Sequence, residues 1–151
     1  MPVERPLDEE EEAELERYFF MALELLPIDP TTQSEEGFLI AACEMLINAL
    51  RQGAEPPEGA SRSDVALWLG VLWGEELCRL GGWNWIYLIT DGGLEGAAVV
   101  DPRRSRAVFP IFAMSKWMQP NSPVHASMQL LTQLLKQRQV ELPAHQYHVL
   151  G

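Results

Sequence analysis

The chain has 151 residues, with 22 Asp and Glu against 11 Lys and Arg, which gives a formal net charge of −11. Hydrophobic residues make up 47% of the chain, which excludes global disorder and predicts a single compact domain. The negative charge opposes nucleic-acid binding, because phosphates are repelled. Two cysteines are too few for a disulfide scaffold.

The negative charge is concentrated near the N-terminus. Residues 1–60 contain 15 acids and 3 bases, whereas residues 61–151 contain 7 acids and 8 bases. A solvated helix start, where acids favour the positive end of the helix dipole, accounts for any single acid of the run in residues 8–16. Seven acids in these nine residues exceed that requirement, so we interpret them as a partner-binding surface. They are Asp8, Glu9, Glu10, Glu11, Glu12, Glu14 and Glu16.

No targeting or membrane-spanning segment is expected. Residues 1–5 lack a basic region followed by an apolar run. The longest uncharged apolar stretch, residues 65–74, is too short to cross a bilayer. Cys43 and Cys78 lie in apolar helical patterns, which suits reduced and buried thiols. We therefore expect a cytoplasmic protein without a membrane partner.

The N-terminal third of the chain predicts two helices. Apolar residues at helical spacing indicate a helix over residues 8–26. A second helix is expected to start after Thr32, which has capping-box spacing to Glu35, and to stop at Gly53. Residues 54–62 have the composition of a loop.

A third helix is predicted over residues 63–80. It is apolar nearly all round, which is typical of a central helix that is covered on several sides. Gly70 and Gly74 share one face, and each glycine within a helix costs about 1 kcal/mol relative to alanine. We therefore expect another backbone or an aromatic ring to approach the helix closely there.

The periodicity then changes to that of strands. Residues 83–90, 97–100 and 107–112, with turn residues between them, predict a small antiparallel meander. Pro110 indicates that the third strand lies at an edge or ends there. Residues 114–118 fit either a short helix or a further strand.

The last helix is expected to begin with Ser122 as N-cap and Pro123 as the first helical residue, and to stop before Pro143. A short, loose tail should follow. The expected fold is therefore α+β, with helices packed on a three- to four-stranded antiparallel sheet in a single domain over residues 1–151. We expect this domain to consist of an acidic helical region (residues 1–60), a body (residues 61–142) and a tail (residues 143–151).

The sequence contains no catalytic constellation, because neither a phosphate-binding loop nor a nucleophile elbow is present. His145 and His148 lack the further ligands that zinc requires, so we expect no metal and no cofactor. His125 would pair with Cys43 or Cys78 only if the fold brought them together. Buried structural cysteines are the preferred interpretation.

Glu75 and Glu76 follow directly on the apolar stretch of the third helix. A carboxylate that faces a core can have a raised pKa and act as a general acid. The alternative is that one glutamate faces solvent and the other pairs with Arg79, which lies four residues after Glu75. We prefer this pair.

Five tryptophans are many for this length. Trp83 and Trp85 alternate along the first strand and share a face, which can stack a ligand, anchor a partner or pack on the third helix. We prefer packing for these two and for Trp68. Trp117 is expected to be the most exposed, and is therefore a partner-binding candidate.

Arg103, Arg104 and Arg106 form the densest basic group of the sequence, at a predicted hairpin tip. Such a cluster can bind an anion or an acidic surface. A solvated turn is the preferred interpretation.

Several short motifs resemble a bacterial family known as domain of unknown function 3806. They are LGVLWGEEL at residues 69–77, GWNW at 82–85, FPI at 109–111 and SKW at 115–117. Trp117 stands where the family usually has arginine. The resemblance implies a small α+β fold, in which the helix glycines and Glu75 would be architectural signature residues. It brings no catalytic residues.

Two functions remain open. The preferred one is a non-enzymatic acidic protein-binding module, such as an immunity or inhibitor protein that neutralises a basic toxin, because acidic surfaces capture basic partners quickly. The alternative is a small enzyme or ligand-binding domain with a pocket between the sheet and helix 63–80, lined by Glu75, Glu76, Trp83 and Trp85. A homodimer through the apolar surplus of that helix is compatible with either.

Overall fold

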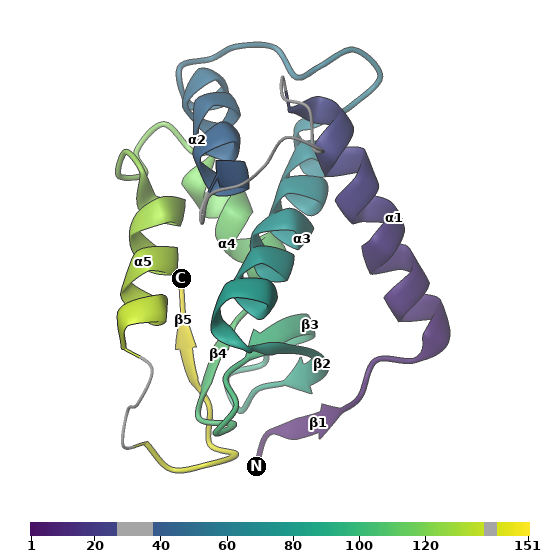
Figure 1. Ribbon diagram of the computed structural model, residues 1–151, viewed down its shortest axis with the longest axis vertical. Coiled ribbons are helices and arrows are strands. Elements are labelled where there is room, and N and C mark those ends of the chain that lie inside the picture. Colours follow the sequence, from purple (N-terminus) through teal and green to yellow (C-terminus); the bar gives the residue numbers. More distant parts are fainter. Residues whose placement is uncertain (27–37, 138–141) are drawn as a thin grey trace.

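The computed structural model describes residues 1–26, 38–137 and 142–151 (Figure 1). Helices and strands alternate irregularly along the described residues, which confirms the α+β class. In chain order the elements are β1 (Val3–Arg5), α1 (Glu9–Leu25), α2 (Phe38–Arg51), α3 (Arg62–Gly81), β2 (Asn84–Ile89), β3 (Glu95–Val100), β4 (Arg106–Val108), α4 (Pro110–Trp117), α5 (Ala126–Lys136) and β5 (His148–Leu150).

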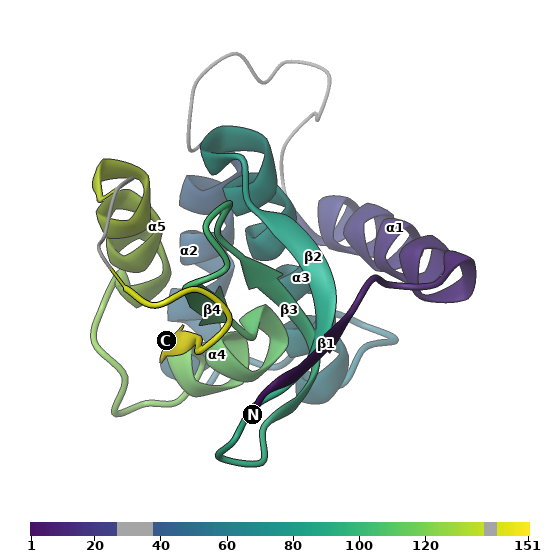
Figure 2. The ribbon, with the colours of Figure 1, turned by 90° about the horizontal axis from the view of Figure 1, so that it is seen from below.

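The sheet has five strands in the order β1-β2-β3-β4-β5. The β2–β3 hairpin forms its centre and pairs over its full length, from Asn84↔Val100 to Ile89↔Glu95. The two edge strands come from opposite ends of the chain, β1 beside β2 and β5 beside β4 (Figure 2). The sheet is thus larger than expected, and mixed, because β5 runs parallel to β4.

Helix α3 lies at the centre of the molecule, as its apolar circumference predicts (Figure 1). Its side chains Leu69, Trp73 and Leu77 are fully buried. Ser61 and Asp64 form a capping box at its start, and Gly82 ends it in the left-handed region at φ 73°. All of residues 62–81 are described, and no apolar side chain among them is exposed. The helix therefore presents no exposed apolar surface through which the expected homodimer could form.

The two glycines of α3 allow the close contacts that the sequence predicts. A Cβ atom at Gly70 would lie 2.7 Å from the Ile111 Cα atom, at the start of α4. A Cβ atom at Gly74 would lie 2.4 Å from the Trp85 ring, on β2. These contacts hold α4 and the sheet against α3.

The expected third strand is wrong beyond Val108, because Pro110 starts α4 instead of ending a strand. Proline suits the first turn of a helix, where its missing N–H has no partner to lose and its φ angle is already helical. The ambiguous segment 114–118 is thereby resolved as helix up to Trp117.

The C-terminal region differs from expectation in two ways. Helix α5 begins at Ala126, with His125 as its N-cap at φ 62°, and not at Pro123. The tail is not loose, because β5 pairs with β4 and Tyr147 is buried against Ile86 and Phe109. The tail thus covers the face of the sheet that lies away from α3.

The expected helix 8–26 is confirmed as α1. The expected capping pair Thr32 and Glu35 lies outside the described residues, and α2 ends two residues before Gly53. No helix within residues 1–26, 38–137 and 142–151 is long and apolar enough to cross a membrane.

Candidate functional site

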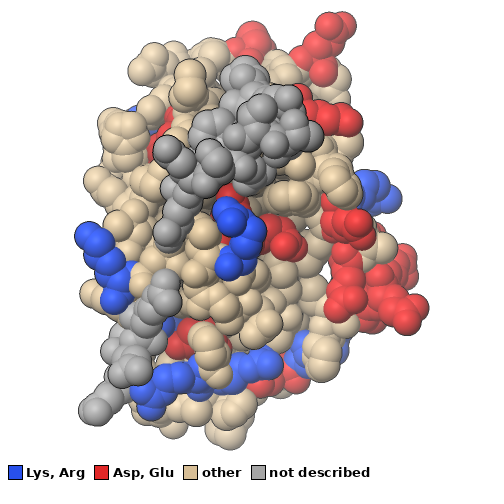
Figure 3. Space-filling view, in the orientation of Figure 1, with Lys and Arg blue, Asp and Glu red and all other residues tan. Residues whose placement is uncertain are grey.

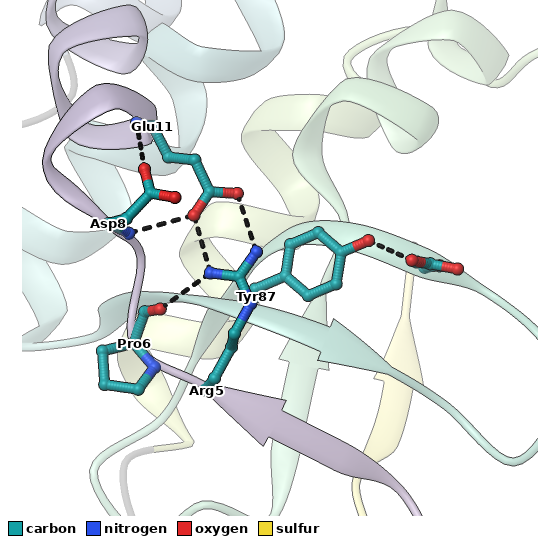
Figure 4. Close-up of polar contacts among 6 residues, drawn as sticks. Arg5, Pro6, Asp8, Glu11 and Tyr87 are labelled. Atoms are coloured by element: carbon teal, nitrogen blue, oxygen red, sulfur yellow. Dashed lines mark hydrogen bonds and ion pairs between the residues drawn. The ribbon is translucent and has the colours of Figure 1, made fainter.

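Two of the seven clustered acids stabilise the start of α1. The Asp8 carboxylate accepts the Glu11 N–H at 2.8 Å, and Glu11 accepts the Asp8 N–H at 3.0 Å (Figure 4). The Arg5 guanidinium donates to Glu11 at 2.7 Å and lies 4.2 Å from the centre of the Tyr87 ring. These contacts lower the pKa of Glu11 to about 2. They connect α1 to β1 and β2.

The other five acids of the run are not part of these stabilising contacts. Among the described residues, none of them forms an ion pair with a base. Figure 3 shows acidic side chains gathered over α1, along one side of the molecule. The charge does not extend to α2, whose acid, Glu44, is buried. The five are Glu9, Glu10, Glu12, Glu14 and Glu16.

A groove of about 380 Å³ separates the middle of α1 from α3 and β2. Glu12 and Glu16 lie one turn apart on the groove side of α1, Glu75 comes from α3, and Trp85 comes from β2. We call this the acidic groove. The fold therefore joins two acids of the run with two of the four pocket candidates. The remaining lining residues are Leu7, Leu15, Phe19 and Asn84.

Glu75 is the innermost acid of the acidic groove. It is half-buried, and its Oε1 atom accepts a hydrogen bond from the Trp85 indole N–H at 3.1 Å. No ion pair joins it to a base of the described residues. Burial raises the pKa of its carboxyl group, and the neighbouring Glu76 adds to this effect. The groove thus holds a partly desolvated carboxylate, to which the described part of the chain supplies no counter-ion.

Glu76 points elsewhere and does not line the acidic groove. It is 2% exposed, and its two oxygens accept from Arg79 at 2.6 and 3.1 Å. One of the two glutamates thus pairs with Arg79, as expected, but it is Glu76 and not Glu75, which the four-residue spacing favours. The reason is that Trp85 already binds Glu75, a contact across elements that helical spacing does not reveal.

Two tryptophans proposed as site residues are buried in the core. Trp117 is 7% exposed, and its ring centre lies 5.3 Å from that of Trp73. Its expected exposure is wrong, because residues 110–117 form a helix that packs on α3. Trp83 is also buried, on the same side of the sheet as Trp85, as the packing interpretation predicts. Neither one lines the acidic groove.

The arginine cluster is largely neutralised by acids. Arg106 is 3% exposed and pairs with the buried Asp101 at 3.1 Å. Arg104 lies 3.9 Å from Glu4. Only Arg103 extends from the turn as an exposed side chain. The cluster therefore stabilises the turn and is not assembled to hold an anion.

A buried polar cluster between α2 and α5 escaped detection from the sequence. Glu44 accepts hydrogen bonds from the Ser127 hydroxyl and from the Met128 N–H, the latter at 2.9 Å. His125 Nδ1 lies 3.4 Å from the same carboxylate, so its partner is an acid and not a thiol. A lone acid within the apolar run of α2 was the available signal.

The two cysteines are free and behave as apolar core residues. Burial raises the pKa of Cys43, which is completely enclosed, and raises that of Cys78 to about 12. Both are therefore protonated at neutral pH and poorly nucleophilic. Over the described ranges of the chain, no group of three or more acidic, His or Cys side chains is placed to hold a metal ion.

Comparison of the chain with family models, curated proteins and solved structures found no match. The resemblance to domain of unknown function 3806 therefore stays a prediction. The function has to be argued from the chemistry of the acidic groove.

Proposed function

We propose that the protein is a non-enzymatic binding module for a basic protein, as an immunity or inhibitor protein that neutralises a basic toxin would be. The observation that carries this proposal is the acidic groove. Three carboxylates from two helices, Glu12, Glu16 and Glu75, surround an apolar lining beside the Trp85 indole. Glu9, Glu10 and Glu14, the other acids of the run without an ion pair among the described residues, lie on the same half of α1.

This arrangement suits lysine and arginine side chains for a physical reason. Their methylene stems pack on apolar surface while the charged group stays with its counter-charges. Leu7, Leu15 and Phe19 provide that apolar surface. A cation beside Glu75 would also offset the desolvation of this carboxylate. The exposed acids along α1 would attract a basic partner and accelerate its encounter.

The alternative, an enzyme or ligand-binding domain, has less support. Its pocket was expected between the sheet and α3, where Leu69, Trp73 and Val99 fill the space. The raised pKa of Glu75 suits a general acid. Glu12 and Glu16 would be the only other groups in the described lining able to assist it, and both are exposed on α1. The proposal also places the protein in the cytoplasm, where Cys43 and Cys78 stay reduced.

Two triple variants of equal net charge test the proposal. One carries Glu12→Gln, Glu14→Gln and Glu16→Gln on α1. Its control carries Glu24→Gln, Glu55→Gln and Glu58→Gln, at exposed positions outside the acidic groove. The probe is a short oligolysine peptide, whose Kd is measured by calorimetry at low and high salt. We expect the first variant to weaken binding about tenfold and the control to change it less than about twofold. Equal losses, or binding that salt does not affect, would contradict the proposal.

A further inference from the structure

One half of strand β2 lacks a neighbour at its outer edge. Strand β3 pairs with the whole of β2, residues 84–89, whereas β1 pairs with residues 87–89 only. Figure 2 shows that the chain turns away from β2 at the end of β1 and continues to α1. Within the described residues, the segment 84–86 therefore borders no further strand on this side.

The open edge presents the main chain of Trp85. The Thr90 N–H donates to the Leu94 carbonyl at 2.8 Å, which continues the hairpin register Asn84↔Val100. Hydrogen-bonded pairs alternate in antiparallel sheets, so Asn84 and Ile86 bond to β3 while the N–H and C=O of Trp85 point to the opposite edge. They are thus aimed away from the hairpin.

No described residue satisfies these two groups. The register Arg5↔Tyr87, continued by two residues, would bring Leu7 opposite Trp85. The chain turns away at Pro6, however, and no backbone hydrogen bond joins Leu7 to Trp85. A donor and an acceptor are therefore available for a strand-like partner.

Space is present on both sides of the open edge. On one side lies the acidic groove, and on the other lies a second cavity of about 310 Å³. Pro6 and Ile86 are among the lining residues of the second cavity, and Asn84 and Trp85 line both cavities. Trp85 thus lies between two hollows, into which a partner segment could extend.

The position of the edge determines which side chain would enter the acidic groove. Directly opposed residues of an antiparallel pair project their side chains to the same face of the sheet. The Trp85 side chain points to the α3 side, where Glu75 accepts its indole N–H. A residue paired with Trp85 would therefore place its side chain among Glu12, Glu16 and Glu75.

We infer that an extended segment of the basic partner adds to the sheet at Trp85 and places a lysine side chain in the acidic groove. This inference rests on the proposed function and gives its binding mode, in which main-chain bonds provide affinity and the groove provides specificity. Lysine is favoured over arginine, because an ammonium group can donate to three separate carboxylates. A guanidinium fork suits one carboxylate with both oxygens free, and Oε1 of Glu75 already accepts from Trp85.

Three matched peptides test this binding mode on the full chain labelled with ¹⁵N. The first is the blocked peptide Val-Lys-Val-Thr. With its lysine opposite Trp85, its first valine lies opposite Ile86, so that it stops short of Tyr87, which pairs with Arg5 of β1. The second has an N-methyl group on the main-chain nitrogen of its lysine, and the third has norleucine in place of lysine. We expect the first to shift the backbone amide resonance of Trp85 and to slow its hydrogen exchange. The second and third peptides should each bind about tenfold more weakly.

The outcomes separate the binding mode from the proposed function. Equal binding of the lysine and N-methyl-lysine peptides, without a response at the Trp85 amide, would overturn strand addition and leave cation binding intact. Equal binding of the lysine and norleucine peptides would overturn the role of the acidic groove as well. Glu75→Gln should weaken the first peptide about tenfold and Glu58→Gln should not, since Glu58 is exposed on a distant loop.

Discussion

The indole N–H of Trp85 donates to Glu75 across the junction of β2 and α3, at 3.1 Å. This hydrogen bond orients both residues at the floor of the acidic groove. It also stabilises the charged form of a carboxylate whose pKa burial raises. Trp85→Phe should therefore raise the pKa of Glu75 further, because the ring stays while the donor is lost. Carbon-13 NMR of the Glu75 carboxyl group during a pH titration measures the change, and an unchanged pKa would refute this role.

The Gly74–Trp85 contact predicts a large effect of one methyl group. Gly74→Ala would place a Cβ atom 2.4 Å from the Trp85 ring, which the packed interior cannot accommodate without movement. We expect a loss of about 1–3 kcal/mol in the free energy of unfolding, as overpacking commonly produces. Gly92→Ala is the control, because its nearest neighbour is 3.9 Å away. Urea denaturation of the two variants should differ accordingly; similar midpoints would show that the ring is not tightly held.

The buried pair of Asp101 and Arg106 predicts that the loss of this aspartate destabilises the protein far more than the loss of an exposed one. Asp101 accepts from the Arg106 N–H and side chain and from the Ser105 N–H and hydroxyl. Asp101→Ala would leave the Arg106 guanidinium buried without its counter-ion, so we expect destabilisation by about 3 kcal/mol. Asp91→Ala, at an exposed turn, should change stability by less than about 0.5 kcal/mol. Thermal unfolding compares the two, and equal effects would argue against a structural role for the pair.

The lowered pKa of Glu11 predicts how stability depends on pH. Arg5 and the Asp8 N–H lower it from 4.5 to about 2, so folding favours the charged form. The stabilisation is therefore complete above the unfolded pKa and is lost as the pH falls from 4.5 towards 2. Glu11→Gln should lower Tm at neutral pH and approach the parent protein in acid, whereas Glu10→Gln should not show this pattern. A Tm difference that is constant with pH would contradict this assignment.

Local patterns predicted the elements whose partners lie nearby in sequence. Helix α3 follows from its periodicity, and the β2–β3 hairpin follows from its turn residues. The close contacts at Gly70 and Gly74 follow from the cost of glycine in a helix. Strands β1 and β5 escaped detection because each has three residues and pairs with a strand distant along the chain. Such short segments show no periodicity of their own.

The residues of the acidic groove could be predicted from the sequence, but their assembly into one site could not. Glu12, Glu16, Glu75 and Trp85 could each be selected from the sequence by residue type. Their assembly depends on α1 packing on α3, through an apolar cluster that includes Leu15 and Val71. The Arg5–Glu11 contact adds a connection between the start of α1 and β1. The mistaken exposure of Trp117 has a similar origin, because Pro110 starts a helix that carries this ring into the core.

The pairing of both terminal segments at the sheet edges has a consequence for the order of folding. β1 is synthesised early, but it has no strand to join until the hairpin of β2 and β3 has emerged from the ribosome. β5 and Tyr147 follow the other strands along the chain, so the sheet face that they cover stays open until they have been added. Contacts between distant segments of a chain form slowly. The sheet face beneath Tyr147 should therefore be among the last parts of the core to close during folding.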